Sequence, residues 1–480
     1  HAGPLLYKNR HGLLHACIIE LSKNNIQGES MPMSNIPHST SDFHYSFKHF
    51  SKLVQLPVAL RRANVLKTKG TPVPILLEWL LSTIFHRYSI FRATATDFSK
   101  KTARNCLNDP RTNWQRLVTL LAVRLIQYVH HFTDSRRRQA LILDDSLFKR
   151  EFSKKTELLA RVFDHDKQVY FKGFRTLTLG WSDGNTFLPI RFALMSSSNP
   201  KNQVGIFKKF DCRTLAARRR AQAQRKMNDV ALELVDAAVG AGIKARYVLF
   251  DSWFTSPHMF AELLKRGRYG IGMLKKSKKV YFRYRGRQMD VKTLYNQLRR
   301  SKWPTKAHYL YSPIVTFDVE GQLMPVKLVF VIKRGHPNDY LVLGTTKTNL
   351  HPQEIIQMYA RRWQIEGYFK VAKQYLQFDK TQIQSYDGLC GHMALVLMGY
   401  DILALAQREN QDDRTFGGIF FEYSRPLPEI SFANALDWLM KTLTGIAKKH
   451  DMSETLLNMI FDEFIKALPS NLVRLLGKAQ

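Results

Sequence analysis

A short segment in the last third of the chain, YARRWQIEGYFKVAK, sets one carboxylate among several cations. At 3.6 residues per turn its polar residues fall on one face of a helix and its apolar residues on the adjoining face. A charged face of this kind is most often simply solvated. A hydroxyl, an Arg, a Glu and two Lys residues at these spacings also suit a carboxylate that holds a cation beside phosphate groups. The residues are Tyr359, Arg362, Glu366, Lys370 and Lys373.

Acids also follow two apolar segments that are predicted to be strands. ALILDD ends with Asp144 and Asp145, and YVLFD ends with Asp251. Acids at the end of a buried strand are costly unless a cation compensates them, although a single Asp is also a common cap. Aspartate and glutamate offer only oxygen ligands, which suit Mg²⁺ or Mn²⁺ rather than Zn²⁺. Two such ions about 4 Å apart would activate a water or a 3′-hydroxyl and stabilise the leaving oxygen of a phosphodiester.

Strands and helices in a particular order must bring these acids together. From residue 139 the sequence predicts three strands, a helix, a strand, a helix, a strand, a β-rich stretch and the Glu366 helix. This order indicates a mixed α/β sheet with the acids at strand ends. Its elements are ALILDD, VYFKGFRTLTLGW, TFLPIRFALM after the turn 182–185, a helix over 215–239, RYVLFD, a helix over 257–266, YGIGML and the stretch 278–345.

The charge of the chain favours a polyanionic partner. Lys and Arg number 73 and Asp and Glu 39, a net charge of +34 on a chain with 45% hydrophobic residues. Nucleic acid is the commonest reason for such an excess. A basic helix over DFSKKTARNCL, capped by Thr94 or Thr96, would present Lys100, Lys101 and Arg104 to DNA, or would equally be part of an ordinary helical bundle.

Two other classes of protein are disfavoured. The apolar segments PILLEWLLSTIF and HMALVLMGYDILALA contain Glu78 and His392 with Asp401, so no stretch is expected to span a membrane. The four cysteines are scattered without paired spacing, which argues against a disulfide framework or a zinc site and fits a reducing compartment.

The three acids and the residues around Glu366 match the sequence pattern of a known family. Two Asp and one Glu on these elements, with Tyr359, Arg362, Glu366 and Lys373 spaced as Y-x2-R-x3-E-x6-K, resemble the insertion-sequence-four family of bacterial cut-and-paste DDE transposases over residues 139–385. The resemblance implies a ribonuclease H-like catalytic domain that uses two Mg²⁺ or Mn²⁺ ions. It assigns Asp145 as the first acid, because Ser146 follows it, with Asp144 as the alternative.

The resemblance also implies an activity. The protein would cleave double-stranded transposon ends through a DNA hairpin and join them to target DNA, as a homodimer in a synaptic complex. The stretch 278–345 would be an insertion that grips the hairpin, and Tyr340 would stack on a flipped base, with Trp303 and Trp253 as alternatives. Rival readings are a DNA-binding protein that has lost cleavage and a metal-dependent nuclease without strand transfer.

The expected organisation follows. We predict a flexible arm over residues 1–40, a helical DNA-binding domain over 41–135, the catalytic domain over 136–385 and a helical dimerisation region over 386–480. The protein would be soluble, without a membrane partner, in the bacterial cytoplasm and associated with the nucleoid.

Overall fold

The computed structural model describes residues 43–67, 69–93, 97–134, 136–164, 167–277, 280–300, 311–333 and 336–410, together with six single residues further on. The chain forms two compact units, one of residues 1–39 and 44–420 and one of residues 40–43 and 421–480. Every element below belongs to the first unit, except the first residue of α2. The expected arm and most of the region after residue 410 lie outside the described residues.

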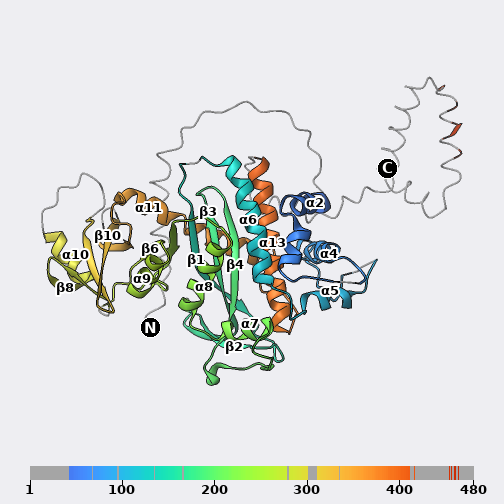
Figure 1. Ribbon diagram of the computed structural model, residues 1–480, viewed down its shortest axis with the longest axis horizontal. Coiled ribbons are helices and arrows are strands. Elements are labelled where there is room, and N and C mark those ends of the chain that lie inside the picture. Colours follow the sequence, from blue (N-terminus) through green and yellow to red (C-terminus); the bar gives the residue numbers. More distant parts are fainter. Residues whose placement is uncertain are drawn as a thin grey trace, which may run out of the picture. The chain divides into compact units, whose positions relative to one another are not determined.

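A mixed sheet of eleven strands, as far as the chain is described, runs through the first unit (Figure 1). The order is β2-β3-β1-β5-β6-β11-β10-β9-β7-β8, and β4 lies beside β3. Strand β1 is antiparallel to β3 and parallel to β5, which is parallel to β6. The bounds are β1 Ala140–Lys149, β2 Ala160–Asp164, β3 Val169–Ser182, β4 Phe187–Met195, β5 Tyr247–Phe250 and β6 Tyr269–Met273.

The β-rich stretch 278–345 continues this sheet, because β11 pairs with β6. It also contains a helix, α10, that the hydrophobic pattern did not predict. Val291, Leu294 and Leu298 of this helix are buried at helical spacing, but the short pattern is enclosed by strand-like sequence. The bounds are β7 Tyr281–Tyr284, β8 Arg287–Asp290, α10 Val291–Arg300, β9 Ile314–Val319, β10 Gln322–Lys333 and β11 His336–Thr345.

Helices from both ends of the described chain cover one part of the sheet. Helices α6 and α13 pack against each other and against β4 (Figure 1). Gln115 and Thr119 of α6 donate to the β4 carbonyls of Phe192 and Ile190, at 2.7 and 3.0 Å, and so cover the free edge of that strand. The bounds are α2 Phe43–Leu53, α3 Leu56–Arg62, α4 Val73–Phe85, α5 Lys100–Leu107, α6 Trp114–Val129 and α13 Tyr386–Asn410.

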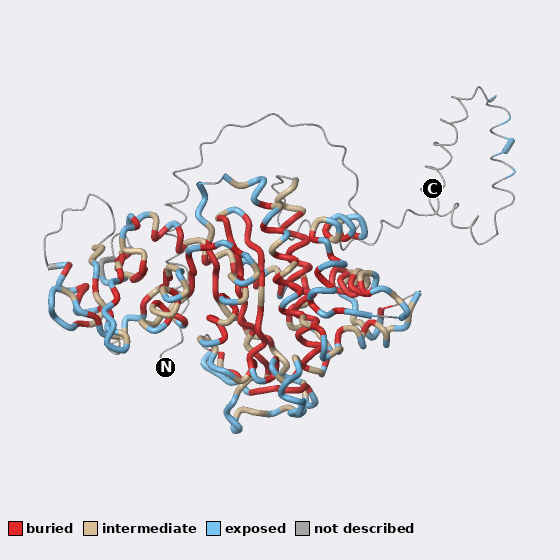
Figure 2. The backbone as a smooth tube through the Cα atoms, viewed as in Figure 1, coloured by how far each residue is buried: buried red, intermediate tan, exposed pale blue. Residues whose placement is uncertain are grey.

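Helix α13 lies in the core of the first unit, as Figure 2 shows. Contrary to our expectation, its segment Tyr386–Glu409 is long and apolar enough to cross a membrane by length and composition, but the 18-residue apolar window within it is buried inside the protein. Burial raises the pKa of Asp401 well above its ordinary value, because the surrounding apolar side chains disfavour the charged carboxylate. The apolar segment that we had considered for dimerisation therefore packs within one chain.

Two helices that the sequence predicts as continuous are each broken in two. The helix expected over 215–239 is α7 Leu215–Ala223 and α8 Met227–Gly240, and the Glu366 segment is α11 Pro352–Ala360 and α12 Trp363–Gln374. The expected helix over 257–266 is α9 Pro257–Lys265. The N-cap of α5 is Ser99, whose hydroxyl accepts from the Thr102 amide at 3.3 Å. The cap is therefore not Thr94 or Thr96, which lie outside the described residues.

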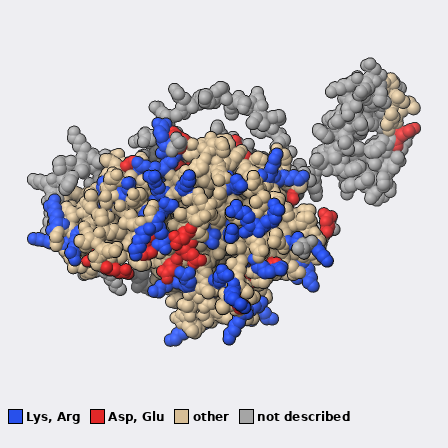
Figure 3. Space-filling model, viewed as in Figure 1, with Lys and Arg blue, Asp and Glu red and all other residues tan. Residues whose placement is uncertain are grey.

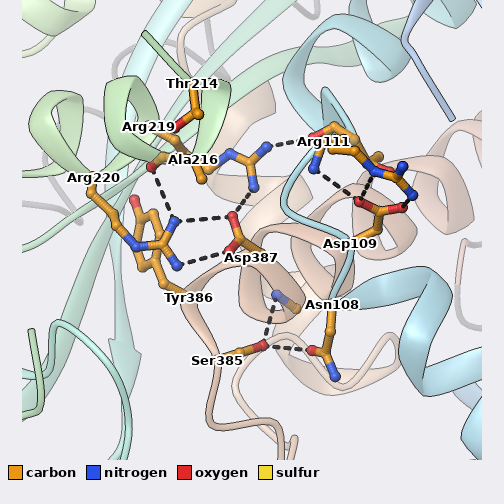
Figure 4. Close-up of polar contacts among 12 residues, drawn as sticks. Asn108, Asp109, Arg111, Thr214, Ala216, Arg219, Arg220, Ser385, Tyr386 and Asp387 are labelled. Carbon is orange, nitrogen blue, oxygen red and sulfur yellow. Dashed lines mark hydrogen bonds and ion pairs between the residues drawn. The ribbon is translucent and has the colours of Figure 1, made fainter. Parts of the chain in front are cut away.

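A buried ion-pair network fastens α7 to the start of α13 (Figure 4). Asp387 accepts from Arg219 and, at 2.7 Å, from Arg220, which also binds Glu157 at 2.7 Å. All four side chains are less than a tenth exposed. The Tyr386 amide donates to Glu157 at 2.9 Å, so two cations and two anions compensate one another.

Candidate active site

Asp144 and Asp251 are brought together by the parallel pairing of β1 and β5. Leu143 pairs with Phe250, and each Asp is the next residue of its segment. Both Asp144 and Asp145 lie within β1, which continues to Lys149, so our expectation that they end a strand was wrong. The strand that ends is β5, where Asp251 Oδ1 caps the following turn by accepting from the Trp253 amide at 2.9 Å.

Asp144 and Asp145 point to opposite sides of the sheet, because side chains alternate along a strand. Asp144 Oδ2 accepts from Arg362 Nη1 at 3.2 Å. Asp145 Oδ2 accepts from Arg175 Nε of the neighbouring strand β3. Arg362 thus faces the acid that is in register with Asp251, and Arg175 faces the other.

The junction of α11 and α12 places Arg362 between two acids. At the junction the amide of Arg362 donates to the carbonyl of Tyr359 at 3.0 Å, three residues back, so the chain turns more tightly than an α-helix. Arg362 Nη2 then donates to Glu366 Oε1 at 2.6 Å while Nη1 holds Asp144. The guanidinium is 6% exposed. It bridges Asp144 and Glu366.

The turn between β3 and β4 anchors the start of α12. Ser182 Oγ donates to Gln364 Oε1 at 2.5 Å, and Gln364 Nε2 donates to the Gly184 carbonyl at 3.0 Å. Gly184 has a φ of +101°, which favours glycine, and a Cβ there would lie 3.1 Å from the Arg361 guanidinium. The hairpin turn that the sequence predicts at 182–185 therefore also positions Arg362 and Glu366.

Tyr359 is fully buried beneath these charges. Burial raises the pKa of its phenol, the nearby Arg362 opposes that shift, and Asp251 and Asp144 add to it. Its hydroxyl makes no well-formed hydrogen bond in the described part of the chain, and neither does the buried hydroxyl of Thr178, which is the cross-strand neighbour of Asp144. Tyr359 therefore lies in the protein interior beside Arg362 and the two aspartates, and it is not exposed to a phosphate at the surface.

The ionised form of the buried Asp144 carboxylate is stabilised by a nearby cation. Burial raises its pKa well above the usual range, Arg362 opposes this shift, and the negative charges of Asp251 and Asp145 raise the pKa further. Burial lowers the pKa of Arg362, but Tyr359, Asp144 and Glu366 outweigh that effect and raise it.

Within the described residues, no three His, Cys, Asp or Glu side chains lie close enough to hold a metal ion. Arg362 instead bridges Asp144 and Glu366, so Glu366 does not converge directly on the two aspartates. The donor chemistry nevertheless fits a divalent cation. Asp144 is short of compensating charge, and Asp251 Oδ2 forms no hydrogen bond or ion pair with any described residue.

The other basic residues that we singled out lie at different places. Lys370 and Lys373 are exposed on α12, and Lys373 lies within the electrostatic reach of Lys149, Asp164 and Asp145. On α5, Lys101 is exposed, whereas Lys100 donates to the Phe91 carbonyl at 3.0 Å and Arg104 stacks on the Phe91 ring. Two of the three α5 cations thus contact Phe91 of the same chain.

Tyr340 is not a free ring. It stacks on Tyr295, with centroids 3.8 Å apart, and the Lys276 ammonium lies 3.9 Å from its centroid. A stacked ring and a cation this close must occupy opposite faces. Trp253 is 43% exposed two residues after Asp251, and Arg175 and Lys275 lie 5.9 and 5.0 Å from its ring centroid. Trp303 lies outside the described residues.

Sequence reasoning missed Arg175 and Thr178. Both lie on β3 and approach the acids only through the pairing of β3 with β1. Their positions near the acids depend on the register between β3 and β1, and this register cannot be inferred from the composition of VYFKGFRTLTLGW.

One comparison with known proteins bears on this site. Residues 88–311 match the DDE superfamily endonuclease family, a range that includes Asp144, Asp145 and Asp251 and ends before Glu366. None of the curated proteins matches the chain. Family and topology agree with the predicted fold class, a mixed α/β sheet with a ribonuclease H-like core. The match supports, for this chain, a DDE-type endonuclease or transposase that acts on DNA.

Proposed function

We propose that this protein cleaves DNA strands by divalent-metal chemistry at Asp144, Asp251 and Glu366. The observation that carries the proposal is the in-register pair Asp144 and Asp251, joined to Glu366 through the buried Arg362. We assign the first acid to Asp144 rather than to Asp145, our first choice from sequence, because Asp145 lies on the other side of the sheet and pairs with Arg175.

When bound, two Mg²⁺ or Mn²⁺ ions would polarise the scissile phosphate and activate the attacking water or 3′-hydroxyl. Asp144 and Asp251 would supply carboxylate oxygens, and Glu366 would add a third carboxylate once it exchanges its ion pair with Arg362. Arg362 would then be free to turn its guanidinium toward a DNA phosphate.

Exposed lysines support binding of the DNA backbone beside the acids. Lys370 and Lys373 project from the helix that carries Glu366, and Lys149 lies near Lys373. Such contacts position DNA without reading its sequence. The burial of Tyr359 favours a different role for it, namely supporting Arg362 from beneath.

The finer activity rests on the resemblance described above. We propose that the substrates are transposon ends, cut through a hairpin and joined to target DNA by a homodimer. In this proposal residues 41–135 bind DNA, residues 136–385 form the catalytic domain with the insertion 278–345, and residues 386–480 contribute to pairing. Because α13 is buried, pairing would use residues after 410. The protein would work in the cytoplasm, close to the nucleoid.

Trp253 is a better candidate than Tyr340 for stacking on an extruded base. It is exposed and follows Asp251 by two residues, whereas both faces of the Tyr340 ring are covered. Stacking of a base on an aromatic ring contributes about 1–3 kcal/mol.

A single experiment separates the candidate activities. Linear DNA that carries the inverted repeats flanking the gene would be incubated with the protein, with and without Mn²⁺, beside a DNA without repeats. Hairpin ends and joined products only on the first DNA support a transposase. Nicking of both DNAs without joining indicates a nuclease, and binding without any cleavage contradicts the enzymatic proposal.

A further inference from the structure

A pocket of about 550 Å³ lies away from the candidate active site, between α3, α6, α8 and β4. Four arginines line it: Arg62, Arg116, Arg124 and Arg191. No Asp or Glu is among the lining residues. Concentrated positive charge without a carboxylate in the wall is a feature of anion-binding sites.

Arg191 is the innermost of the four. It lies on β4 beside an irregularity of the β3–β4 pairing, and its Nη1 donates to the neutral Thr119 hydroxyl at 3.1 Å. Its Nε is buried without a partner in the described part of the chain. Burial lowers the pKa of this guanidinium to about 10, although the charge of Glu233 opposes the shift. Such a group lacks the anion that would compensate it.

The other three arginines also form no ion pair with an acid in the described part of the chain. Arg124 donates only to amide oxygens, those of Gln55 at 2.9 Å and Gln127 at 3.4 Å. The side chains of Arg62 and Arg116 are exposed and form no hydrogen bond or ion pair with the residues that the structure describes.

Elsewhere on the surface, exposed arginines do find acids. Arg111, Arg136 and Arg213 each bind an aspartate two residues away. The pocket therefore differs from a generally basic surface, because four arginines line one hollow and none of them forms an ion pair with an acid among the described residues. Figure 3 shows Lys and Arg gathered right of centre, between the regions that Figure 1 labels α6 and α4.

The sheet register separates this pocket from the acids. Leu143 of β1 pairs with Leu179 of β3, which pairs with Arg191. Residues in register share a face of the sheet, so Arg191 points to the side opposite Asp144. Two strand spacings of about 4.8 Å place its backbone roughly 10 Å across the sheet from β1.

We propose that this arginine pocket binds backbone phosphates of DNA, as a second contact that fixes the duplex relative to the acids. The choice of DNA as the polyanion rests on the proposed function. A contact on the other face of the sheet would engage phosphates away from the scissile one, and so orient the substrate without taking part in the chemistry.

Binding of the full-length chain to a labelled duplex, measured by fluorescence anisotropy in EDTA over a series of salt concentrations, tests the pocket without cleavage. Arg62→Ala, Arg116→Ala and Arg124→Ala should each weaken binding and lower the salt slope by about 0.9 for every DNA phosphate that the variant no longer neutralises. Arg61→Ala is the matched control, since Arg61 is exposed on the same helix as Arg62 and does not line the pocket. A wild-type affinity and slope in all three pocket variants would overturn the proposal.

Two further measurements complete the test. Arg191→Met should weaken DNA binding without lowering the thermal midpoint of the free protein, because it removes an uncompensated buried charge; a lower midpoint with unchanged binding would make Arg191 structural and overturn its role. Inorganic pyrophosphate should compete only weakly with DNA. Tight pyrophosphate binding that Arg62→Ala abolishes, with DNA binding unchanged, would assign the pocket to a small phosphate ligand and overturn the proposal.

The outcome is independent of catalysis. If wild-type protein fails to cleave any DNA but Arg62→Ala still weakens binding relative to Arg61→Ala, the proposed function fails and the arginine pocket stands. If cleavage occurs and the variants bind normally, the reverse holds.

Discussion

Asp144 and Asp251 are neighbours across the β1–β5 pair, because each follows one partner of the parallel pair Leu143 and Phe250. This relationship favours Asp144 over Asp145, which was the first acid that the sequence analysis assigned by resemblance. Asp144 shares the side of Arg362 and Glu366, and Asp145 shares the side of Arg175.

The first prediction concerns the choice between these acids. Asp144→Asn should reduce DNA cleavage by more than about 100-fold, since even changes around a metal ligand can cost that much, and should weaken Mn²⁺ binding measured by calorimetry. Asp145→Asn should retain more activity and normal Mn²⁺ affinity. The opposite ranking would return the first acid to Asp145.

A second prediction concerns Arg362. Its replacement by Ala leaves the buried Asp144 carboxylate without its partner, so the free energy of unfolding should fall by about 3–5 kcal/mol in metal-free protein. Mn²⁺ should restore part of this stability, because it can take over the compensating charge. Lys370→Ala, an exposed change on the helix that follows Arg362, should leave the unfolding transition in place. Equal transitions for both variants would show that Arg362 does not compensate Asp144.

The network of Asp387 with Arg219 and Arg220 provides a third prediction. Asp387→Asn leaves a buried arginine charge unbalanced and should destabilise the protein by about 3–5 kcal/mol in denaturant unfolding. Asp211→Asn breaks a similar but exposed pair with Arg213 and should change stability little. A silent Asp387→Asn would mean that solvent reaches the network.

The aromatic residues give a fourth prediction. Trp253→Ala should leave first-strand nicking intact and slow hairpin formation about tenfold or more, because the extruded base no longer has a ring to stack on. Tyr340→Ala should affect hairpin formation less and should lower thermal stability, since Tyr340 stacks on Tyr295. Gel analysis of nicked and hairpin products over time would decide between them. Slower hairpin formation in Tyr340→Ala alone would reinstate Tyr340.

A fifth prediction concerns pH. Burial lowers the pKa of His392 from 6.5 to about 4, while its Nε2 donates to the Gln377 carbonyl at 3.0 Å. Between pH 6.5 and pH 4, His392 is therefore protonated in the unfolded chain but neutral in the folded chain. The contribution of His392 to the free energy of unfolding is complete above pH 6.5 and decreases as the pH falls toward 4. The slope should be at most about 1.4 kcal/mol per pH unit. Thermal midpoints of His392→Gln, which keeps a donor, should fall less than wild type between pH 7 and pH 5; parallel curves would contradict the assignment.

The sequence by itself determined most of the order of the elements and the types of residue that are available at the candidate site. Hydrophobic patterns predicted most strands, the turn at 182–185 and the acids that follow apolar segments, because these features depend on neighbouring residues. The spacing of Arg362 and Glu366 placed both residues on one helix face, and the structure pairs them at 2.6 Å.

The tertiary structure alone decided which side chains meet. Asp144 faces Asp251 because of a strand register that no local pattern encodes, since a shift by one residue would exchange the sides of Asp144 and Asp145. The break between α11 and α12 puts Tyr359 in the core, although a continuous helix would leave it beside Glu366. Arg191 and Arg62 share a pocket only because α3 and β4, which are far apart along the chain, pack on the same helix, α6. The sequence of neither segment specifies this packing, because it depends on side chains that are distant along the chain.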